Sequence, residues 1–240
     1  MKIVVLVKEV PDTYGDRKLD LETGLADRAA SERVLDEIGE RAIEAAISLK
    51  EGAPDAEVVL VSMGPDSASA GLRKGLAMGA DRAVHVLDAE LVGADLTLTA
   101  ETLAAAVRRE SPDLVIAGVL STDGTGAVVP AMVAEHLGWA RLTSMNSVAA
   151  GDGRASGVRA TDLGTATVSA ALPAVVSITE AMPEARFPNF KGIMAAKKKP
   201  LDTVSLGDLS LAASLDSPRS IMTAIAQKPP RAGGTVVVDE

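Results

Sequence analysis

A glycine-rich stretch with hydroxyl and carboxylate side chains is the first candidate for chemistry. Residues 118–126 read GVLSTDGTG and lie between an expected strand and an expected helix. Such a loop can expose backbone N–H groups to an anion, and the N-terminus of the following helix adds partial positive charge. The alternative is an ordinary turn in which Asp123 or Thr125 caps the helix. The stretch matches neither the GxxxxGK[ST] nor the GxGxxG pattern, so by itself it leaves both interpretations open.

Two further stretches have the composition of contact sites. Residues 62–65, Ser-Met-Gly-Pro, end another expected strand, where Gly64 would allow either the close approach of a ligand or a tight turn into a helix. Residues 186–194, RFPNFKGIM, contain two of the four aromatic residues of the chain. Apolar anchors rimmed by basic and polar residues are typical of a protein–protein contact. We expect that contact here, and the alternative is a loop whose phenylalanines pack under their own domain.

The composition gives no indication of acid–base or nucleophilic catalysis. The chain has no cysteine, which excludes thiolate nucleophiles, disulfides and cysteine-bound iron–sulfur clusters. His85 and His136 lie too far apart for a zinc pair on one helix. No nucleophile with a neighbouring base emerges, so we expect neither a catalytic site nor a metal site.

The charges separate an acidic body from a basic C-terminal stretch. The net charge is −9, whereas residues 186–231 hold eight Lys or Arg and three Asp. Net acidity argues against nucleic acid, because binding to phosphates depends on counterion release by cations. A basic tail indicates docking to another molecule. The apolar run before Lys8 is too short for a signal peptide and no segment suits a membrane span, so we expect a cytoplasmic protein without membrane insertion.

Strand-like and helix-like segments alternate through the first 140 residues. The expected strands are 3–7, 57–62, 83–87 and 114–118, and the expected helices are 36–50, one capped by Asp66, one around 96–107 and one at about 125–137. The four strands are continuous apolar runs, which are typical of a parallel sheet buried on both faces. The sequence therefore predicts an α/β, Rossmann-like fold with helices on both sides of a parallel sheet. The polar residues 11–33 read as a loop or short hairpin.

The pattern changes after residue 140. Short strands at 143–149, 153–161 and 165–171, separated by Gly-Asp-Gly and Asp-Leu-Gly, predict a small β-hairpin region, and a buried strand follows at 175–178. From residue 182 onward prolines are frequent and periodicity is lost, which predicts an extended arm. We therefore expect an α/β domain at 1–185 and, at 186–240, an arm that stays ordered only if it lies on another surface.

Four stretches, in order, resemble the beta subunit of electron transfer flavoprotein. They are VLVKEVPDT; SLKEGAPDAEVVLVSMGP with LRKGLAMGADRAVHV; DLVIAGVLSTDGTG; and LPAVVSITEAMPEARFPNFKGIMAAKKKPL. The resemblance covers almost the whole chain. It implies an electron-carrier subunit, not an enzyme, that pairs with an alpha subunit holding most of a shared FAD. It also implies that residues 1–185 form a nucleotide-binding domain and that residues 186–240 form a recognition loop and a C-terminal arm wrapping the partner subunit. It further implies electron donors such as the acyl-CoA dehydrogenases of fatty acid beta-oxidation, and a membrane electron transfer flavoprotein–quinone oxidoreductase as acceptor.

The same resemblance implies ligands and binding residues. The beta chain would hold AMP as a structural ligand, or a second FAD in an electron-bifurcating relative. The residues implied to bind the nucleotide and the FAD are Leu6, Val7, Lys8, Asp36, Ile38, Gly39, Met63, Gly118, Ser121, Thr122, Asp123, Gly124, Thr125 and Gly126. Among these, Ile38, together with the region of Thr13 and Tyr14, would approach the FAD of the alpha chain. The residues implied to contact partners are Phe187, Phe190, Ile193 and Met194, with Phe190 as the inserted anchor.

Three positions depart from the family pattern. Asp-Gly-Thr-Gly stands where some members have Asn-Gln-Thr-Gly, Asp36 stands where Asn is more usual, and Phe190 replaces a branched aliphatic residue. An acidic Asp123 beside a phosphate bears directly on the charge of the ligand.

A free-standing adenine-nucleotide-binding protein of the universal-stress type is a second interpretation. It would use the same 118–126 loop, bind ATP as a homodimer and need no flavin. The long C-terminal arm argues against it, because a nucleotide sensor of that kind does not need an arm that docks to a partner protein.

Overall fold

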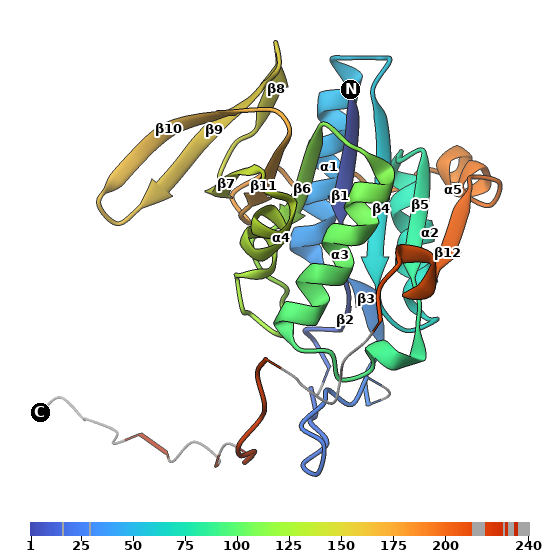
Figure 1. The fold of residues 1–240 in the computed structure, drawn as a ribbon, viewed down its shortest axis with the longest axis vertical. Coiled ribbons are helices and arrows are strands. Elements are labelled where there is room, and N and C mark those ends of the chain that lie inside the picture. Colours follow the sequence, from blue (N-terminus) through green and yellow to red (C-terminus); the bar gives the residue numbers. More distant parts are fainter. Residues whose placement is uncertain (16, 29, 213–218, 228, 230–232, 235–240) are drawn as a thin grey trace, which may run out of the picture.

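The order of the strands in the sheet determines which chain segments meet at the carboxyl ends of the parallel strands. The computed structural model describes residues 1–15, 17–28, 30–212, 219–227, 229 and 233–234. In them a mostly parallel sheet has the order β10-β9-β7-β11-β6-β1-β4-β5-β12, with β8 paired to β9, and helices cover both faces (Figure 1). The predicted fold class, an α/β sheet enclosed by helices, is confirmed.

The parallel part of the sheet is built from continuous apolar runs. Its strands are β1 (Lys2–Leu6), β4 (Glu57–Met63), β5 (Arg82–Val86), β6 (Leu114–Gly118), β11 (Ala174–Ile178) and β12 (Leu201–Val204). Ile3, Val4 and Val5 of β1 have no solvent-exposed surface, because successive side chains point to opposite faces and both faces are covered. A separate short pair, β2 (Glu9–Pro11) and β3 (Arg33–Leu35), brackets the polar segment that was expected to form a loop or hairpin.

Helices divide between the two faces. Core residues of α1 (Glu37–Glu51) and α2 (Ala68–Met78) pack together on one face, and those of α3 (Leu96–Glu110) and α4 (Val129–Leu137) on the other. The chain runs β1, β4, β5 outward in one direction and then returns to place β6 on the other side of β1. The strand order therefore reverses between β1 and β6, which is where open α/β sheets bind ligands.

Two helix starts differ from the expectation. Asp66 does not cap α2, whose N-cap is Ser67; the Ser67 hydroxyl donates to Glu9 at 2.6 Å and does not cap the helix. The fourth helix begins at Val129 rather than near Thr125, so neither Asp123 nor Thr125 caps it. Thr125 and Ala127 have φ of +50° and +54°, which a right-handed helix cannot include.

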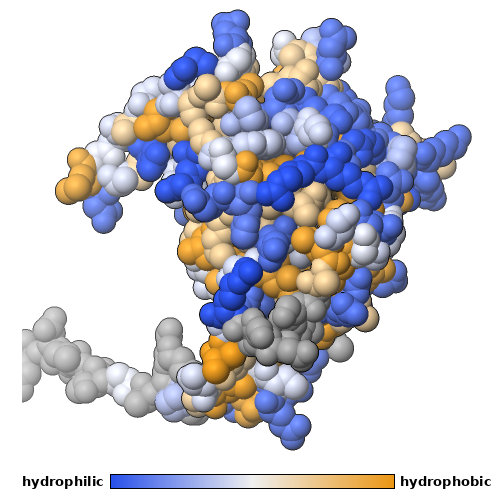
Figure 2. All heavy atoms as spheres, in the orientation of Figure 1, coloured by the Kyte–Doolittle hydropathy of each residue, from blue (hydrophilic) through white to orange (hydrophobic). Residues whose placement is uncertain are grey.

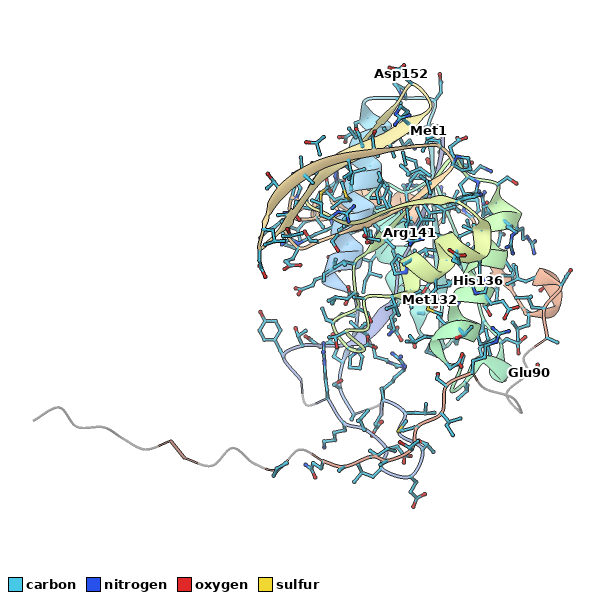
Figure 3. The ribbon with its side chains drawn as sticks, turned by 60° about the vertical axis from the view of Figure 1, so that its left-hand side comes forward. Met1, Glu90, Met132, His136, Arg141 and Asp152 are labelled. Atoms are coloured by element: carbon cyan, nitrogen blue, oxygen red, sulfur yellow. The ribbon has the colours of Figure 1, made fainter. Side chains whose placement is uncertain are left out.

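The hairpin region projects from the body. It comprises β7 (Ala140–Met145), β8 (Ala149–Gly151), β9 (Arg154–Thr161) and β10 (Gly164–Ala171), and β9 and β10 are paired antiparallel over their whole length. The predicted hairpins are confirmed, but the strand expected at 143–149 is divided into β7 and β8, with residues 146–148 outside both strands. The β9–β10 ribbon extends away from the helices in Figure 1 and arches across the molecule in the turned view of Figure 3.

Part of the expected C-terminal arm is folded onto the body. Residues 190–196 form α5 (Phe190–Ala196), and β12 joins the sheet edge parallel to β5, followed by a short turn of 3-10 helix at Gly207–Leu209. The prediction of an extended chain is wrong for this part. Further on, Arg219 and Ser220 donate backbone N–H bonds to Asp95, both at 2.9 Å. Residues 213–218, 228, 230–232 and 235–240 of the expected arm lie outside the described residues.

No helix in the part of the chain that the structure describes combines the length and the apolar character that a membrane crossing requires.

A remaining short element, the 3-10 turn at Ala89–Leu91, links β5 to α3.

Candidate functional site

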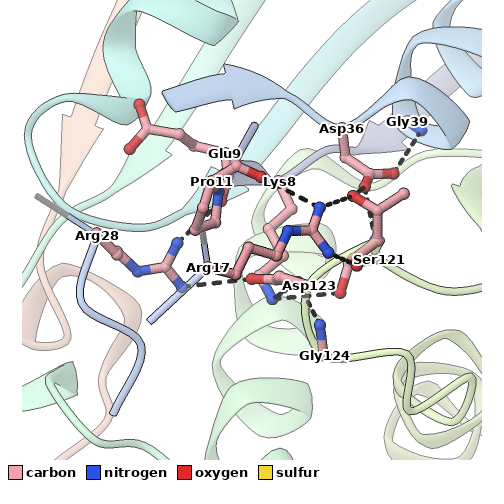
Figure 4. Close-up of polar contacts among 11 residues, drawn as sticks. Lys8, Glu9, Pro11, Arg17, Arg28, Asp36, Gly39, Ser121, Asp123 and Gly124 are labelled. Carbon is pink, nitrogen blue, oxygen red and sulfur yellow. Dashed lines mark hydrogen bonds and ion pairs between the residues drawn. The ribbon is translucent and has the colours of Figure 1, made fainter. Parts of the chain in front are cut away.

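The candidate site lies at the carboxyl ends of β1 and β6. Lys8 follows β1, and the loop of residues 119–128 follows β6, so the two flank the point where the strand order reverses. The polar segment 12–32, between β2 and β3, folds back over the same edge, and Figure 4 shows the contacts made there. Topology thus brings three separate stretches of sequence together.

Asp36 joins helix α1 to the loop. Its buried carboxylate accepts hydrogen bonds through Oδ2 from the backbone N–H groups of Ile38 and Gly39, both at 3.2 Å. Through Oδ1 it accepts from the N–H and the hydroxyl of Thr122, at 2.8 and 2.7 Å. A single carboxylate therefore caps the helix and fixes the position of the loop (Figure 4).

Asp123 forms the charged centre of the loop. Its Oδ1 accepts from Lys8 Nζ at 2.8 Å and from the Gly124 N–H at 2.6 Å, and its Oδ2 lies 3.7 Å from the Arg28 guanidinium. Burial acts to raise the pKa of Asp123, but the hydrogen bonds from Lys8 and Ser121 and the charge of Lys8 outweigh it and hold that pKa below its ordinary value. The carboxylate is therefore ionised at neutral pH.

A third cation reaches the loop from the polar segment. Arg17 donates to the carbonyl and, at 3.3 Å, to the hydroxyl of Thr122, and at 3.2 Å to the carbonyl of Pro11. Arg17 and Arg28 were not among the residues expected at the site. The only signal for them was their position between two short segments whose pairing, as β2 and β3, was not predicted in detail.

The backbone beyond Asp123 is open to an anion. The Thr125 N–H is bonded to the Ser121 carbonyl at 2.9 Å, whereas within the described residues no partner is found for the N–H groups of Gly126, Ala127 and Val128. Left-handed residues alternate with their neighbours there, and α4 begins directly afterwards. Free N–H groups of this kind, followed by a helix N-terminus, suit a phosphate group, and no atom lies within 4 Å of where a Gly126 side chain would stand.

Gly118 holds the loop close to α1. A Cβ at this position would stand 2.9 Å from Ile38 Cγ2 and 3.2 Å from the Leu120 carbonyl oxygen. We therefore expect Gly118→Ala to lower the free energy of unfolding by about 1–3 kcal/mol, because neighbouring atoms must shift. Gly126→Ala is the matched control and should leave unfolding in urea unchanged, since its side chain would meet open space. Equal stability of the two variants would contradict this packing.

The structure brings together some of the expected site residues and separates others. Lys8, Asp36 and the segment 121–123 meet through the bonds described above. Leu6 and Met63 belong to the α3–α4 side of the sheet, whereas Val7 and Ile38 belong to the α1–α2 side, so these four line the edge from both faces. The side of the loop formed by Gly124, Thr125 and Gly126 is exposed.

A hollow beside α1 and the buried histidine do not provide a better candidate site than the carboxyl ends of β1 and β6. A hollow of about 560 Å³ lies between α1 and the segments 146–148 and 181–183, and it includes none of the expected nucleotide-binding residues. Within the residues that the structure describes, no group of three or more His, Asp or Glu side chains is arranged to hold a metal ion. The buried His85 is bonded to the Gly64 carbonyl at 3.1 Å, which is a structural role.

The four expected partner-binding residues form an exposed apolar patch on and beside α5. Phe187 and Phe190 are 95% and 78% exposed, which excludes the alternative that they pack under their own domain. Ile193 and Met194 are also exposed. The helix itself is firmly placed, because Asn189 caps it and Gly192 lies against the Ala77 carbonyl, too close for any side chain.

The segment before α5 is anchored by charge. The Arg186 guanidinium donates to the carboxylates of Glu44 and Glu51 on α1, with contacts of 2.8 and 2.6 Å. Side-chain hydrogen bonds from Arg186 hold the pKa of Glu44 below its ordinary value. The apolar patch is therefore presented on a fixed support.

Comparison with known proteins places the chain in a family. The family model described as the electron transfer flavoprotein domain matches residues 23–209. The chain belongs to the electron transfer flavoprotein beta-subunit family. The electron transfer flavoprotein subunit beta of Mycobacterium tuberculosis is 44% identical over 99% of this chain and 92% of its own length. That of Syntrophomonas wolfei is 36% identical over 100% and 91%. The resemblance inferred from the four stretches of sequence is confirmed.

Family membership decides the class of activity. Members are subunits of electron transfer flavoproteins, which carry electrons and are not classical enzymes. A further relative, subunit CarD of the caffeyl-CoA reductase–Etf complex of Acetobacterium woodii, is 33% identical over 98% of this chain and 90% of its own length.

Proposed function

We propose that the chain is the beta subunit of a heterodimeric electron transfer flavoprotein and that the 118–126 loop holds AMP as a structural ligand. The observation that carries this proposal is the loop at the strand-order reversal, with unpartnered N–H groups and three cations beside it. FAD, held mainly by an alpha subunit, would accept and release the electrons. Dehydrogenases of the acyl-CoA type would be the donors and a membrane quinone oxidoreductase the acceptor.

The residues at the site would divide the work of binding. Lys8, Arg17 and Arg28 supply positive charge to a phosphate, and the N–H groups of 126–128 supply directed hydrogen bonds. At the end of β4 the half-buried Met63 offers apolar surface for an adenine ring, whereas Leu6 at the end of β1 is buried and would lie beneath it. Asp36 binds no ligand in this arrangement; it fixes the loop and α1 relative to each other.

The β9–β10 ribbon supports pairing with an alpha subunit. Most side chains of β10 are exposed, and Leu163 at the turn between the strands is fully exposed. A two-stranded ribbon has little stability when both of its faces are in water, so we infer that a partner covers it. In Figure 2 the free end of this ribbon carries apolar surface well away from the body.

The patch on α5 supports transient docking of electron donors. Phe187, Phe190, Ile193 and Met194 are exposed together, and Lys191, Lys197 and Lys198 lie in the same segment. Aromatic anchors give binding energy, and the surrounding cations increase the rate of encounter with an acidic partner. A short-lived complex of this kind is what an electron carrier requires.

An electron-bifurcating subunit, with a second FAD in the place of AMP, is the second candidate. The relative CarD is named as a subunit of a caffeyl-CoA reductase–Etf complex, so a relative of this chain works in a complex with a reductase. Both candidates use the same loop and the same alpha-subunit contact, and they differ only in the ligand that the loop holds.

Co-expression with an alpha subunit tests the pairing. We expect a yellow, equimolar complex that stays together through gel filtration, because the exposed ribbon would become covered. Expression of the beta chain alone, as a control, should give a colourless protein. A colourless beta chain that remains separate in the presence of the alpha chain would contradict the proposal.

A further inference from the structure

The Asp123 carboxylate already binds hydrogen-bond donors and cations that a phosphate would otherwise bind. It takes one hydrogen bond from Lys8 and one from the Gly124 N–H, and it faces Arg28 (Figure 4). Its side chain is only 10% exposed, whereas the side chain of Lys8 is 41% exposed. Lys8 therefore has room to face a ligand while it stays paired with Asp123.

We propose that Asp123 limits the negative charge of the nucleotide that the loop accepts, so that a monophosphate is bound and di- and triphosphates are rejected. This inference rests on the proposed function of the loop. Among the charged groups bonded at the site, Lys8, Arg17 and Arg28 are cationic and Asp36 and Asp123 are anionic, which leaves one positive charge. Without the charge of Asp123 two positive charges would remain.

The other carboxylate at the site cannot perform this task. Asp36 is buried, and four donors from Ile38, Gly39 and Thr122 satisfy its two oxygens. Asp123 instead stands on the loop itself, one residue before the exposed stretch 124–128. It is therefore the nearer fixed negative charge to any phosphate bound at the free N–H groups.

The size of the effect follows from the ligand charges. A terminal phosphate carries about −1.5 to −2 at neutral pH, and each further phosphoryl group adds about one more negative charge. The two phosphates of FAD give it a total charge close to that of AMP. Both ligands of the proposed function therefore carry no more negative charge than the site accepts. Each added charge beyond this should weaken binding about tenfold at moderate salt.

The test compares AMP, ADP and ATP on the full chain after bound nucleotide has been removed. Isothermal titration should show that the wild-type chain binds AMP and binds ATP much more weakly. In Asp123→Asn the ratio of the ATP to the AMP dissociation constant should fall about tenfold or more, because one repulsive charge is lost. Asp123→Glu, which keeps the charge, should retain most of the wild-type ratio.

A matched control removes the same charge far from the loop. Asp152 lies at the turn between β8 and β9, near Met1 and hence at the opposite end of the sheet from the site (Figure 3). It has a φ of +50°, which Asn tolerates well. Asp152→Asn should therefore leave the ratio of the two dissociation constants unchanged. Asp123→Ser repeats the test if the Asn variant is poorly folded by circular dichroism.

The outcomes separate this inference from the function on which it rests. A wild-type chain that binds none of the three nucleotides would overturn both. A chain that binds AMP, but whose ATP-to-AMP ratio is unchanged in Asp123→Asn, would overturn the charge limit alone. Loss of AMP binding in a folded Asp123→Asn variant would also overturn it, because Asp123 would then hold the ligand instead of restricting its charge.

Discussion

Replacement of Asp36 by alanine is expected to lower the free energy of unfolding by about 3 kcal/mol. The buried carboxylate accepts two hydrogen bonds from the first turn of α1 and two from Thr122, so its removal takes away a helix cap and the attachment of the loop. Urea unfolding followed by circular dichroism measures the loss. Nucleotide affinity should fall in the same variant, because the 119–128 loop is no longer fixed to the helix.

Asp66→Ala is the matched control for this prediction. Asp66 is an exposed aspartate two residues before α2, but it does not cap that helix. Its replacement should change stability by less than about 0.5 kcal/mol. Asp36→Asn keeps one acceptor oxygen and should fall between wild type and Asp36→Ala. If Asp36→Ala and Asp66→Ala were equally stable, the assigned role of Asp36 would be wrong.

The second large effect is expected at the α5 patch. Phe190→Ala should weaken the reduction of the electron carrier by a dehydrogenase about 30-fold at sub-saturating concentrations, because a central aromatic anchor contributes about 2 kcal/mol to an interface. Phe190 is 78% exposed, so its truncation creates no cavity in the free chain. Stopped-flow reduction of the heterodimer at several dehydrogenase concentrations gives the measurement.

Flavin content distinguishes docking from folding in this experiment. The Phe190→Ala heterodimer should keep the full absorbance of its flavin, since Phe190 lies outside the nucleotide site. Val92→Ala serves as the control, because Val92 is a similarly exposed apolar side chain on another element. Loss of flavin from the Phe190 variant, or an unchanged rate of reduction, would refute the assignment of the patch.

The parallel sheet was predictable because its strands carry a local signal. The runs that became β1, β4, β5 and β6 are apolar on consecutive positions, and only burial on both faces accounts for such runs. The hairpins could also be predicted from the sequence, since Gly-Asp-Gly and Asp-Leu-Gly mark their turns. Helix α1 followed from its apolar spacing and from Asp36 at its start.

Elements that depend on distant partners were missed. Strand β12 is four residues long, carries two exposed residues and exists because β5 offers it an unpaired edge, which no local pattern reveals. Helix α5 has Gly192 in its middle, which a propensity argument counts against a helix, but that glycine allows close packing on α2. Tertiary contact outweighed local preference in both cases.

The candidate site was predictable only in part, for a similar reason. Lys8, Asp36 and the 118–126 loop lie at strand ends or a helix start, so the α/β pattern with the family resemblance placed them. Arg17 and Arg28 contact Thr122 and Asp123 from a segment with little secondary structure. Contacts between residues about 100 positions apart produce no periodic pattern in the sequence, so they could not be predicted from it. The pairing of β2 with β3 brings them there.

The ligand content of the purified heterodimer tests the central claim most directly. Acid extraction of the co-expressed complex followed by chromatography should release one FAD and one AMP for each heterodimer, or two FAD if the chain is of the electron-bifurcating kind. In the Gly126→Ala complex the flavin of the alpha chain should be retained while the nucleotide of the loop is reduced. A complex that contains FAD in the alpha chain and no adenine nucleotide in the beta chain would contradict the claim.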